Sequence, residues 1–126
     1  CHSIRSETPF LFQGKLSDLN VGTDGGVTCA PAVEQAVMSA ARSAANYSSV
    51  LNGRFRGGWT TRHYGQPGKR VHAIQLELAQ HNYLSSEAPP FAFDTERATR
   101  LRPHLNAMLT ALEALAVRGD LKEVAQ

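Results

Sequence analysis

The strongest strand pattern in the sequence, Val71–Ala79, constrains the fold more than any other feature. It follows the turn formers Gly65-Gln66-Pro67-Gly68 and is rich in aliphatic residues. A run of this kind indicates an interior strand that is covered on both faces of a sheet. Because side chains alternate along a strand, one face carries His72, Ile74, Leu76 and Leu78, and the other carries Ala73, Gln75 and Glu77.

A first helical pattern runs from Pro31 to about Tyr47. Thr28 can cap this helix, Pro31 suits its first turn, and Glu34 favours its positive start. The helix has an apolar stripe, which predicts close packing against a sheet and consists of Val33, Val37, Ala40 or Ala41, and Ala44.

A second helical pattern begins after Asp94, which is a good N-cap, and reaches about Val117. Glu96 lies in its first turn, and Gly119 is a natural stop. Pro103 predicts a kink or a restart within this helix. The apolar stripe consists of Leu101, Leu105, Met108, Leu112 and Leu115.

Shorter strands are predicted at Leu19–Thr23, Ser49–Phe55 and Trp59–Tyr64, the last two separated by Gly57-Gly58. Strands mixed with helices favour an α/β layered architecture. Three or four strands and two helices are few for a sheet that is covered on both faces. The sequence also opens with the chemically dense residues 1–5 instead of a polar segment, so we expect it to be part of a longer domain.

Composition excludes several classes of function. The length of 126 residues suits one domain, and the net charge of +2 is too small to argue for nucleic acid or an anionic membrane surface. No apolar stretch approaches the roughly 20 residues that cross a bilayer, and we expect no signal peptide. Cys1 and Cys29 form no CxxC pair and fit two free thiols in a reducing compartment, so a cytoplasmic location is predicted.

Glu77 is the most informative single residue. A carboxylate within an apolar strand loses its hydration at a cost in free energy unless it is paired or used. Burial would raise the pKa of Glu77 toward neutrality, where a carboxyl group exchanges protons efficiently. The alternative is that Glu77 lies near a strand end and reaches solvent or a salt-bridge partner.

His2 is a candidate metal ligand, because imidazole commonly binds zinc. Catalytic zinc usually has three protein ligands, however, and one histidine does not make a site. His72 is expected to pack on an apolar strand face and His104 on a helix surface. None of the remaining histidines forms a close pair at metal-ligand spacing, these being His63, His72, His81 and His104.

The segment Asn52–Gly65 is rich in hydrogen-bond donors, among them Arg54, Arg56 and Arg62. Guanidinium groups bind carboxylates through two parallel hydrogen bonds, and glycines let backbone amides approach a ligand. Both a site for an anionic small molecule and a β-hairpin with a solvated basic face account for the pattern. Gly57-Gly58 lacks the GxxxxGKS/T arrangement of a phosphate-binding loop.

Four segments together resemble the N-formylglutamate amidohydrolase family. Cys1-His2-Ser3-Ile4 is similar to its Asp-x-His-Ser motif, with the aspartate position immediately before this sequence. Asn52–Gly65 resembles its Asn-x-x-Phe-x-Gly-Gly-(aromatic)-x-Thr-Arg-x-Tyr-Gly segment. His72–Gln80, centred on Gln75-Leu76-Glu77, resembles its penultimate strand, and Pro90–Arg97 resembles the entrance to its last helix.

The resemblance implies a mixed central sheet flanked by helices, related in fold to the zinc carboxypeptidases, with residues 1–126 as the C-terminal half of one amidohydrolase domain. It implies zinc-dependent hydrolysis of N-formyl-L-glutamate to formate and L-glutamate in histidine degradation. His2 would be the zinc ligand from this half, and Glu77 the general base that deprotonates zinc-bound water. The N-terminal half would supply the other ligands, so this chain alone is expected to be inactive.

The resemblance also implies residues that bind the substrate. Arg62 is the first choice for the substrate carboxylates because it stands in the Thr-Arg-x-Tyr-Gly motif, and Arg56 and Arg54 are further candidates. Asn52 would orient the substrate by hydrogen bonding, and Tyr64 either lines the pocket or belongs to the core.

Rival functions stay open from the sequence. One is a non-catalytic module that binds small acidic ligands through the three arginines, and another is an interaction domain whose half-sheet is completed by a partner. A deacylase for a different N-acyl amino acid is a near relative of the first hypothesis. The residues alone would also accept iron, cobalt or nickel in place of zinc. Glu77 favours an enzyme, because an anion-binding module gains nothing from a carboxylate buried near its arginines.

Overall fold

The computed structural model describes residues 1–119 and 121. Within them, one mixed sheet of four strands has the order β1-β4-β2-β3. β1 lies parallel to β4 and β2 parallel to β3, whereas β2 and β4 are antiparallel. Since β4 lies between two neighbours, the predicted interior strand is confirmed. The strands are β1 His2–Ile4, β2 Leu19–Gly22, β3 Ser49–Leu51 and β4 Gln75–Ala79.

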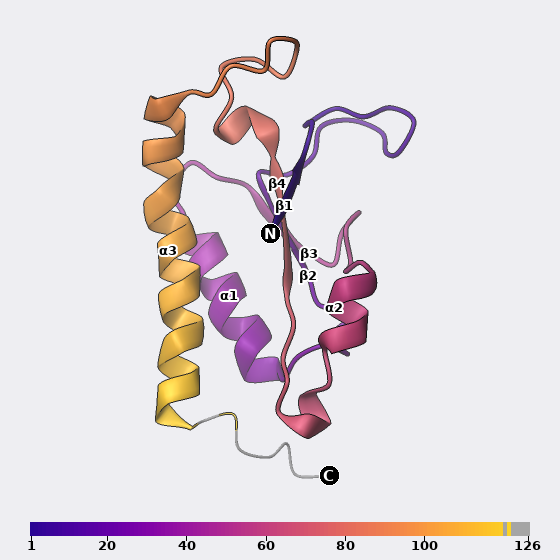
Figure 1. Ribbon diagram of the computed structural model, residues 1–126, viewed down its shortest axis with the longest axis vertical. Coiled ribbons are helices and arrows are strands. Elements are labelled where there is room, and N and C mark those ends of the chain that lie inside the picture. The colour runs from indigo at the N-terminus through magenta and orange to yellow at the C-terminus, as the bar shows by residue number, and fades with distance from the viewer. Residues whose placement is uncertain (120, 122–126) are drawn as a thin grey trace.

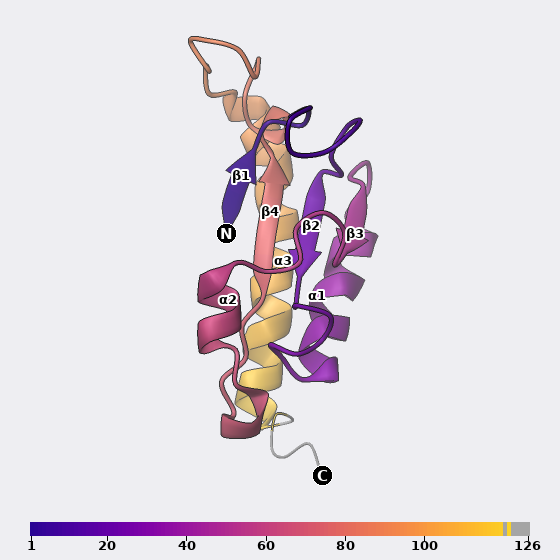
Figure 2. The same cartoon turned by 90° about the vertical axis from the view of Figure 1, so that its right-hand side faces the viewer.

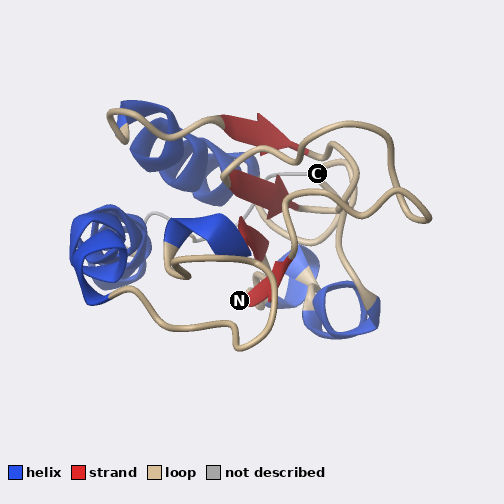
Figure 3. Cartoon of the chain, turned by 90° about the horizontal axis from the view of Figure 1, so that it is seen from above, coloured by secondary structure: helices blue, strands red, loops and turns tan. Residues whose placement is uncertain are grey.

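Helices lie on both sides of this sheet. α1 (Pro31–Ser43) and α3 (Thr95–Arg118) pack side by side on one face, and α2 (Trp59–Tyr64) lies on the other (Figures 1 and 3). Two short 3-10 helices, η1 (Pro67–Lys69) and η2 (Gln80–Asn82), flank the segment that contains β4. The predicted α/β class, a mixed sheet flanked by helices, is confirmed.

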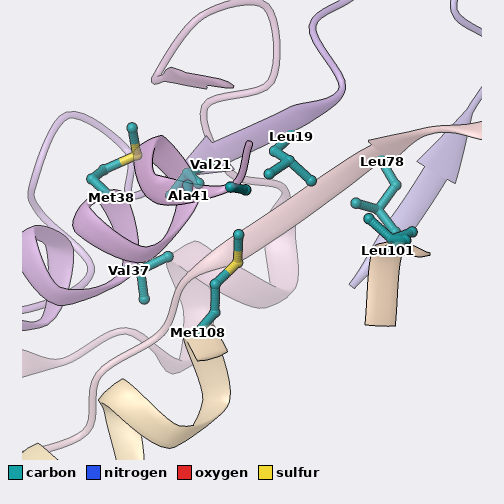
Figure 4. Close-up of a cluster of buried hydrophobic side chains, with 9 residues drawn as sticks. Leu19, Val21, Val37, Met38, Ala41, Leu78, Leu101 and Met108 are labelled. Carbon is teal, nitrogen blue, oxygen red and sulfur yellow. The ribbon is translucent and has the colours of Figure 1, made fainter. Parts of the chain in front are cut away.

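The hydrophobic core lies between the sheet and the pair α1 and α3 (Figure 4). Leu78 on β4 contributes to it, and Leu76 and Ile74 pack against it. Apolar burial of this kind stabilises the fold by about 25 cal/mol per Å², and it fixes which face of β4 looks toward α3. The nine buried residues are Leu19, Val21, Val37, Met38, Ala41, Ala44, Leu78, Leu101 and Met108.

The predictions for the long helix are confirmed except at Pro103. The Asp94 side chain accepts a hydrogen bond from the backbone N–H of Arg97, and Gly119 ends the helix in the left-handed conformation with φ 70°. The stripe is also confirmed, because Leu101, Met108 and Leu115 are buried. The helix continues through Pro103 without a restart. Packing along the α1 face outweighs the one backbone hydrogen bond that proline cannot donate.

The first helix ends at Ser43, a few residues before the predicted end. Pro31 occupies its first turn and Glu34 follows, as predicted. The prediction that Thr28 caps it was wrong, because the N-cap is Ala30 and makes no side-chain hydrogen bond. The Thr28 hydroxyl instead donates to the backbone oxygen of Ala73 at 2.8 Å.

The prediction of a strand at Trp59–Tyr64 was wrong, since this segment is the helix α2. One helical turn brings the rings of Trp59 and His63 into a stack, with centroids 4.2 Å apart. The aromatic residues favour a strand by propensity, but two contacts stabilise the helix instead. These are the ring stack and the hydrogen bond from the Gly58 N–H to the Gln75 Oε1 at 2.6 Å.

Two predicted strands are shorter than expected. Ser49–Phe55 was predicted, but β3 ends at Leu51 because Asn52 adopts the left-handed conformation with φ 50°. Val71–Ala79 was predicted, but β4 begins at Gln75. Before it, the backbone N–H of Ala73 donates to the backbone oxygen of Thr28, so this stretch pairs with a loop.

A close backbone approach joins the end of β2 to the segment before α2. The N–H of Asp24 donates to the backbone oxygen of Arg56 at 2.6 Å. A Cβ atom on Gly22 would lie 2.7 Å from the backbone carbon of Arg56, which leaves no room for a side chain. Gly57 adopts φ 131°, a conformation that favours glycine.

No helix in residues 1–119 has both the length and the apolar character needed to cross a membrane. Both cysteines are free thiols, with Cys1 exposed and Cys29 buried, as predicted.

We predict that Gly22→Ala lowers the free energy of unfolding by about 1–3 kcal/mol, because the added methyl group forces two backbone segments apart. The matched control is Gly68→Ala, since a Cβ there meets nothing within 4 Å. Urea denaturation followed by circular dichroism measures both. Equal unfolding midpoints for the two variants would contradict the close approach.

Candidate functional site

Glu77 lies on the face of β4 that looks away from the α1 and α3 core. Leu76 and Leu78 pack with the core, so the alternation of the strand turns Glu77 to the other face, where it lines a cavity with α2 residues. Its side chain is buried, with 6% of the residue exposed. Desolvation raises the pKa of Glu77 above its ordinary value, against the lowering effect of the positive charge at His2.

His2 is a titratable neighbour of this carboxylate on the adjacent strand. The register of β1 on β4 pairs His2 with Glu77, and Figure 2 shows the two strands side by side. His2 itself is exposed. Parallel pairing in register places both side chains on the same face of the sheet. An imidazole and a buried carboxylate thus stand on neighbouring strands, and their roles as zinc ligand and base stay predictions.

Both residues line the same cavity, which has a volume of about 790 Å³. The wall toward α2 carries Trp59, Thr61 and Tyr64. Trp59 is 64% exposed and Tyr64 57% exposed, so of the two alternatives for Tyr64 the structure supports pocket lining over core. The cavity combines the carboxyl group of Glu77, the imidazoles of His2 and His72, and an aromatic wall.

None of the three arginines lines this cavity. Arg62 donates from Nη1 to the backbone oxygen of Gly57 at 2.6 Å, and Arg54 donates from Nε to the backbone oxygen of Leu11 at 2.9 Å. Arg56 is exposed, with its guanidinium beside Gly25. Their substrate roles stay predictions, and the described residues hold all three outside the cavity wall.

Asn52 uses both ends of its amide within the protein. Its Oδ1 accepts from the backbone N–H of Thr23 at 2.9 Å, and its Nδ2 donates to the Thr23 hydroxyl oxygen at 2.8 Å. The Thr23 hydroxyl in turn donates to Glu34 Oε2 at 2.6 Å. These bonds tie the ends of β2 and β3 to α1. The substrate role of Asn52 stays a prediction beside this structural one.

The remaining histidines lie apart from one another. His72 accepts from the backbone N–H of Ala30, and His81 Nε2 lies 2.6 Å from an Asp18 oxygen. His63 stacks on Trp59, and His104 meets the Tyr47 ring edge to face. Only His72 of these four lines the cavity.

The described residues do not form a complete zinc site. Within residues 1–119 and 121, no three His, Cys, Asp or Glu side chains are close enough to hold a metal ion. His2 fits the role of one ligand, because it is exposed and lines the cavity beside Glu77. Catalytic zinc usually takes three protein ligands, so this donor set alone is too small.

The sequence did not predict that the side chain of Gln75 joins α2 to the sheet. The alternation of β4 placed Gln75 on the face of Glu77, but a strand was predicted where α2 lies. The structure shows that Gln75 Oε1 accepts from the backbone N–H of Gly58 at 2.6 Å and lies 3.5 Å from the Thr61 hydroxyl. Both Gln75 and Thr61 line the cavity.

The fold and the cavity define an α/β protein with a buried strand carboxylate beside an exposed histidine. The family model of N-formylglutamate amidohydrolases matches residues 1–84, which include every candidate site residue discussed above. The chain belongs to the N-formylglutamate amidohydrolase family.

Two curated relatives carry the name N-formylglutamate deformylase. The protein of Pseudomonas aeruginosa is 49% identical over 113 residues, and that of Pseudomonas putida is 48% identical over 113 residues. Each match covers 90% of this chain and 42% of the relative, so the chain spans less than half the length of these proteins.

A solved structure supports the fold. The crystal structure of N-formylglutamate amidohydrolase from Ralstonia eutropha JMP134 superposes with a TM-score of 0.70 at 24% identity. The match covers 90% of this chain and 38% of that protein. The arrangement of sheet and helices therefore occurs in a structure that carries the family name.

We predict that Glu77→Gln raises stability at neutral pH relative to the wild type. Since the folded-state pKa is raised, ionising Glu77 costs folding free energy above that pKa, and the neutral amide avoids this cost. The advantage should shrink as pH falls and vanish below 4.5, the ordinary value, where both states of the wild type are protonated. Thermal unfolding between pH 4 and pH 8 measures it, and a pH-independent difference would contradict the burial argument.

We predict that Asn52→Gly lowers the free energy of unfolding by about 1–3 kcal/mol through loss of both bonds to Thr23. Glycine tolerates the left-handed backbone at this position, so the change isolates the amide. Asn52→Asp keeps the acceptor for the Thr23 N–H and should lower the free energy of unfolding by less than Asn52→Gly does. Urea denaturation of the three proteins gives the ranking, and unchanged midpoints in both variants would show that Asn52 is not structural.

Proposed function

We propose that this chain carries the general base of an enzyme that hydrolyses N-formyl-L-glutamate to formate and L-glutamate. One observation supports this most: a buried carboxylate, Glu77, shares a cavity with His2 across paired strands. The family and the names of the two Pseudomonas relatives supply the substrate. The proposal extends to the whole protein, of which the described residues form one part of the site.

Glu77 performs the proton transfers in this proposal. Its carboxylate accepts a proton from the attacking water, and the water oxygen forms a bond to the formyl carbon. The carbon–nitrogen bond then breaks, and Glu77 passes the proton to the leaving amine of glutamate. Burial raises the pKa of Glu77, which makes its carboxylate a stronger base for taking the proton from water in the first step.

We further propose zinc as the cofactor, with His2 as one ligand and the others from residues outside 1–126. Bound zinc would supply a Lewis acid that polarises the formyl carbonyl and makes water a stronger acid. His2 suits this role because it lies exposed at the cavity. Its pairing with β4 fixes its distance along the sheet from Glu77.

Arg62 remains our first proposal for the substrate carboxylates, followed by Arg56 and Arg54. Guanidinium groups match carboxylates in geometry and charge. All three are exposed, and the only side-chain hydrogen bonds of Arg62 and Arg54 among the described residues go to backbone oxygens. They are therefore able to exchange these contacts for a ligand.

The wider setting of the enzyme follows the same proposal. The fold would be related to that of the zinc carboxypeptidases, and the N-terminal half of the same domain would complete sheet and site at the β1 edge. The reaction would serve histidine degradation in the cytoplasm. A non-catalytic module for acidic ligands accounts less well for the site, because it needs neither a buried Glu77 nor His2 in the same cavity.

The test compares residues 1–126 with the full-length product of the gene that encodes them. We expect the full-length protein to bind zinc and release formate from N-formyl-L-glutamate. Glu77→Gln should lower kcat by at least about 100-fold through loss of the base while zinc stays bound. Elemental analysis and a formate assay measure both quantities.

The control is Glu113→Gln on the solvent-exposed side of α3, which should leave kcat unchanged. A full-length protein that binds no metal and releases no formate would overturn the proposed function. A Glu77→Gln enzyme of full activity would overturn the assignment of the base.

A further inference from the structure

The Gln75 side chain is held at one end only. Its Oε1 accepts from the backbone N–H of Gly58 at 2.6 Å, and because an N–H can only donate, the atom facing it must be the oxygen. The Thr61 hydroxyl lies 3.5 Å from the same oxygen. The orientation of the amide is therefore fixed by the start of α2.

Fixing the oxygen leaves the amide nitrogen available. Gln75 is only partly buried and lines the cavity with Glu77 and His2. Among residues 1–119 and 121, no protein group accepts a hydrogen bond from its Nε2. An anchored amide with a free N–H₂ end in a cavity is preorganised to donate to a ligand oxygen.

The position of Gln75 on the strand decides which part of a ligand it reaches. Gln75 and Glu77 share a face of β4 and stand two residues apart, which is about 7 Å along a strand. A general base must lie within hydrogen-bond reach of the reacting group, at about 3 Å. Gln75 is thus too far from Glu77 along the strand to contact the carbonyl group that reacts. It can instead contact a substrate group several bonds away from that carbonyl.

We propose that Gln75 determines specificity by donating from Nε2 to a carboxylate of the substrate. The inference rests on the proposed function, because an N-acyl amino acid carries its carboxylates a few bonds from the amide that is cut. Gln75 supplies a neutral donor close to Glu77, whereas the three candidate arginines lie outside the described cavity wall. It selects N-acyl amino acids over simple formamides.

The test uses two variants of the full-length enzyme. Gln75→Glu keeps an oxygen that can accept from the Gly58 N–H, but it replaces the donor with a negative charge. Gln75→Leu removes both anchor and donor. We expect KM for N-formyl-L-glutamate to rise about tenfold or more in Gln75→Leu, the usual effect of losing a hydrogen bond to a charged group.

The Glu variant separates binding from structure. We expect Gln75→Glu to raise KM further than Gln75→Leu, since it sets two carboxylates against each other, with a melting temperature near that of the wild type. A purely structural role predicts the opposite order: Gln75→Glu with a normal KM, and Gln75→Leu with a lowered melting temperature. That order would overturn the inference.

Calorimetric titration with L-glutamate measures ligand binding without the reaction. It therefore tests the Gln75 inference separately from the proposed function. If the wild type releases formate but both variants keep its KM, the Gln75 inference fails alone. If the wild type releases no formate, yet binds L-glutamate more tightly than Gln75→Glu does, the proposed reaction fails and the Gln75 inference holds. A wild type that does neither overturns both.

Discussion

The pairing of β4 with its two neighbours is the constraint on which the rest of the structure depends. The strand is held antiparallel to β2 and parallel to β1, so its two faces have fixed and different surroundings. Leu76 and Leu78 bury apolar area against α1 and α3 on one face. Because side chains alternate, that burial forces Glu77 and Gln75 to the other face, whatever the cost of desolvating a carboxylate there. The hydrophobic core therefore positions the polar site.

Polar side chains also connect the helices to the sheet on both of its faces. Gln75 holds the start of α2, and Asn52 with Thr23 joins the ends of two strands to Glu34 on α1. The bonds to Asn52 and Glu34 also give partners to the backbone N–H and hydroxyl of Thr23, which is buried. The cavity is lined by residues of β1, β4 and α2, and the sheet fixes how these segments lie relative to one another.

The sequence predicted those parts of the fold that periodicity and capping control. The interior strand, both apolar stripes, the Asp94 cap and the Gly119 stop are local patterns, and all were found. The strand predicted at Trp59–Tyr64 failed because its conformation depends on Gln75, a residue distant in sequence. For the same reason the sequence did not show that the Asn52 amide also bonds to Thr23, a contact that depends on the fold.

In the proposed function, Glu77 brings stability and catalysis into conflict at one residue. A fold selected for stability alone would place an apolar side chain at this position, since desolvation of a carboxylate opposes folding. His2 offsets part of that cost from the neighbouring strand, and its charge lowers the pKa that burial raises. The pairing of β1 with β4 therefore moderates the pKa of the carboxyl group that we propose as the base. In the proposed function, a strand as short as β1 thus belongs to the site as well as to the sheet.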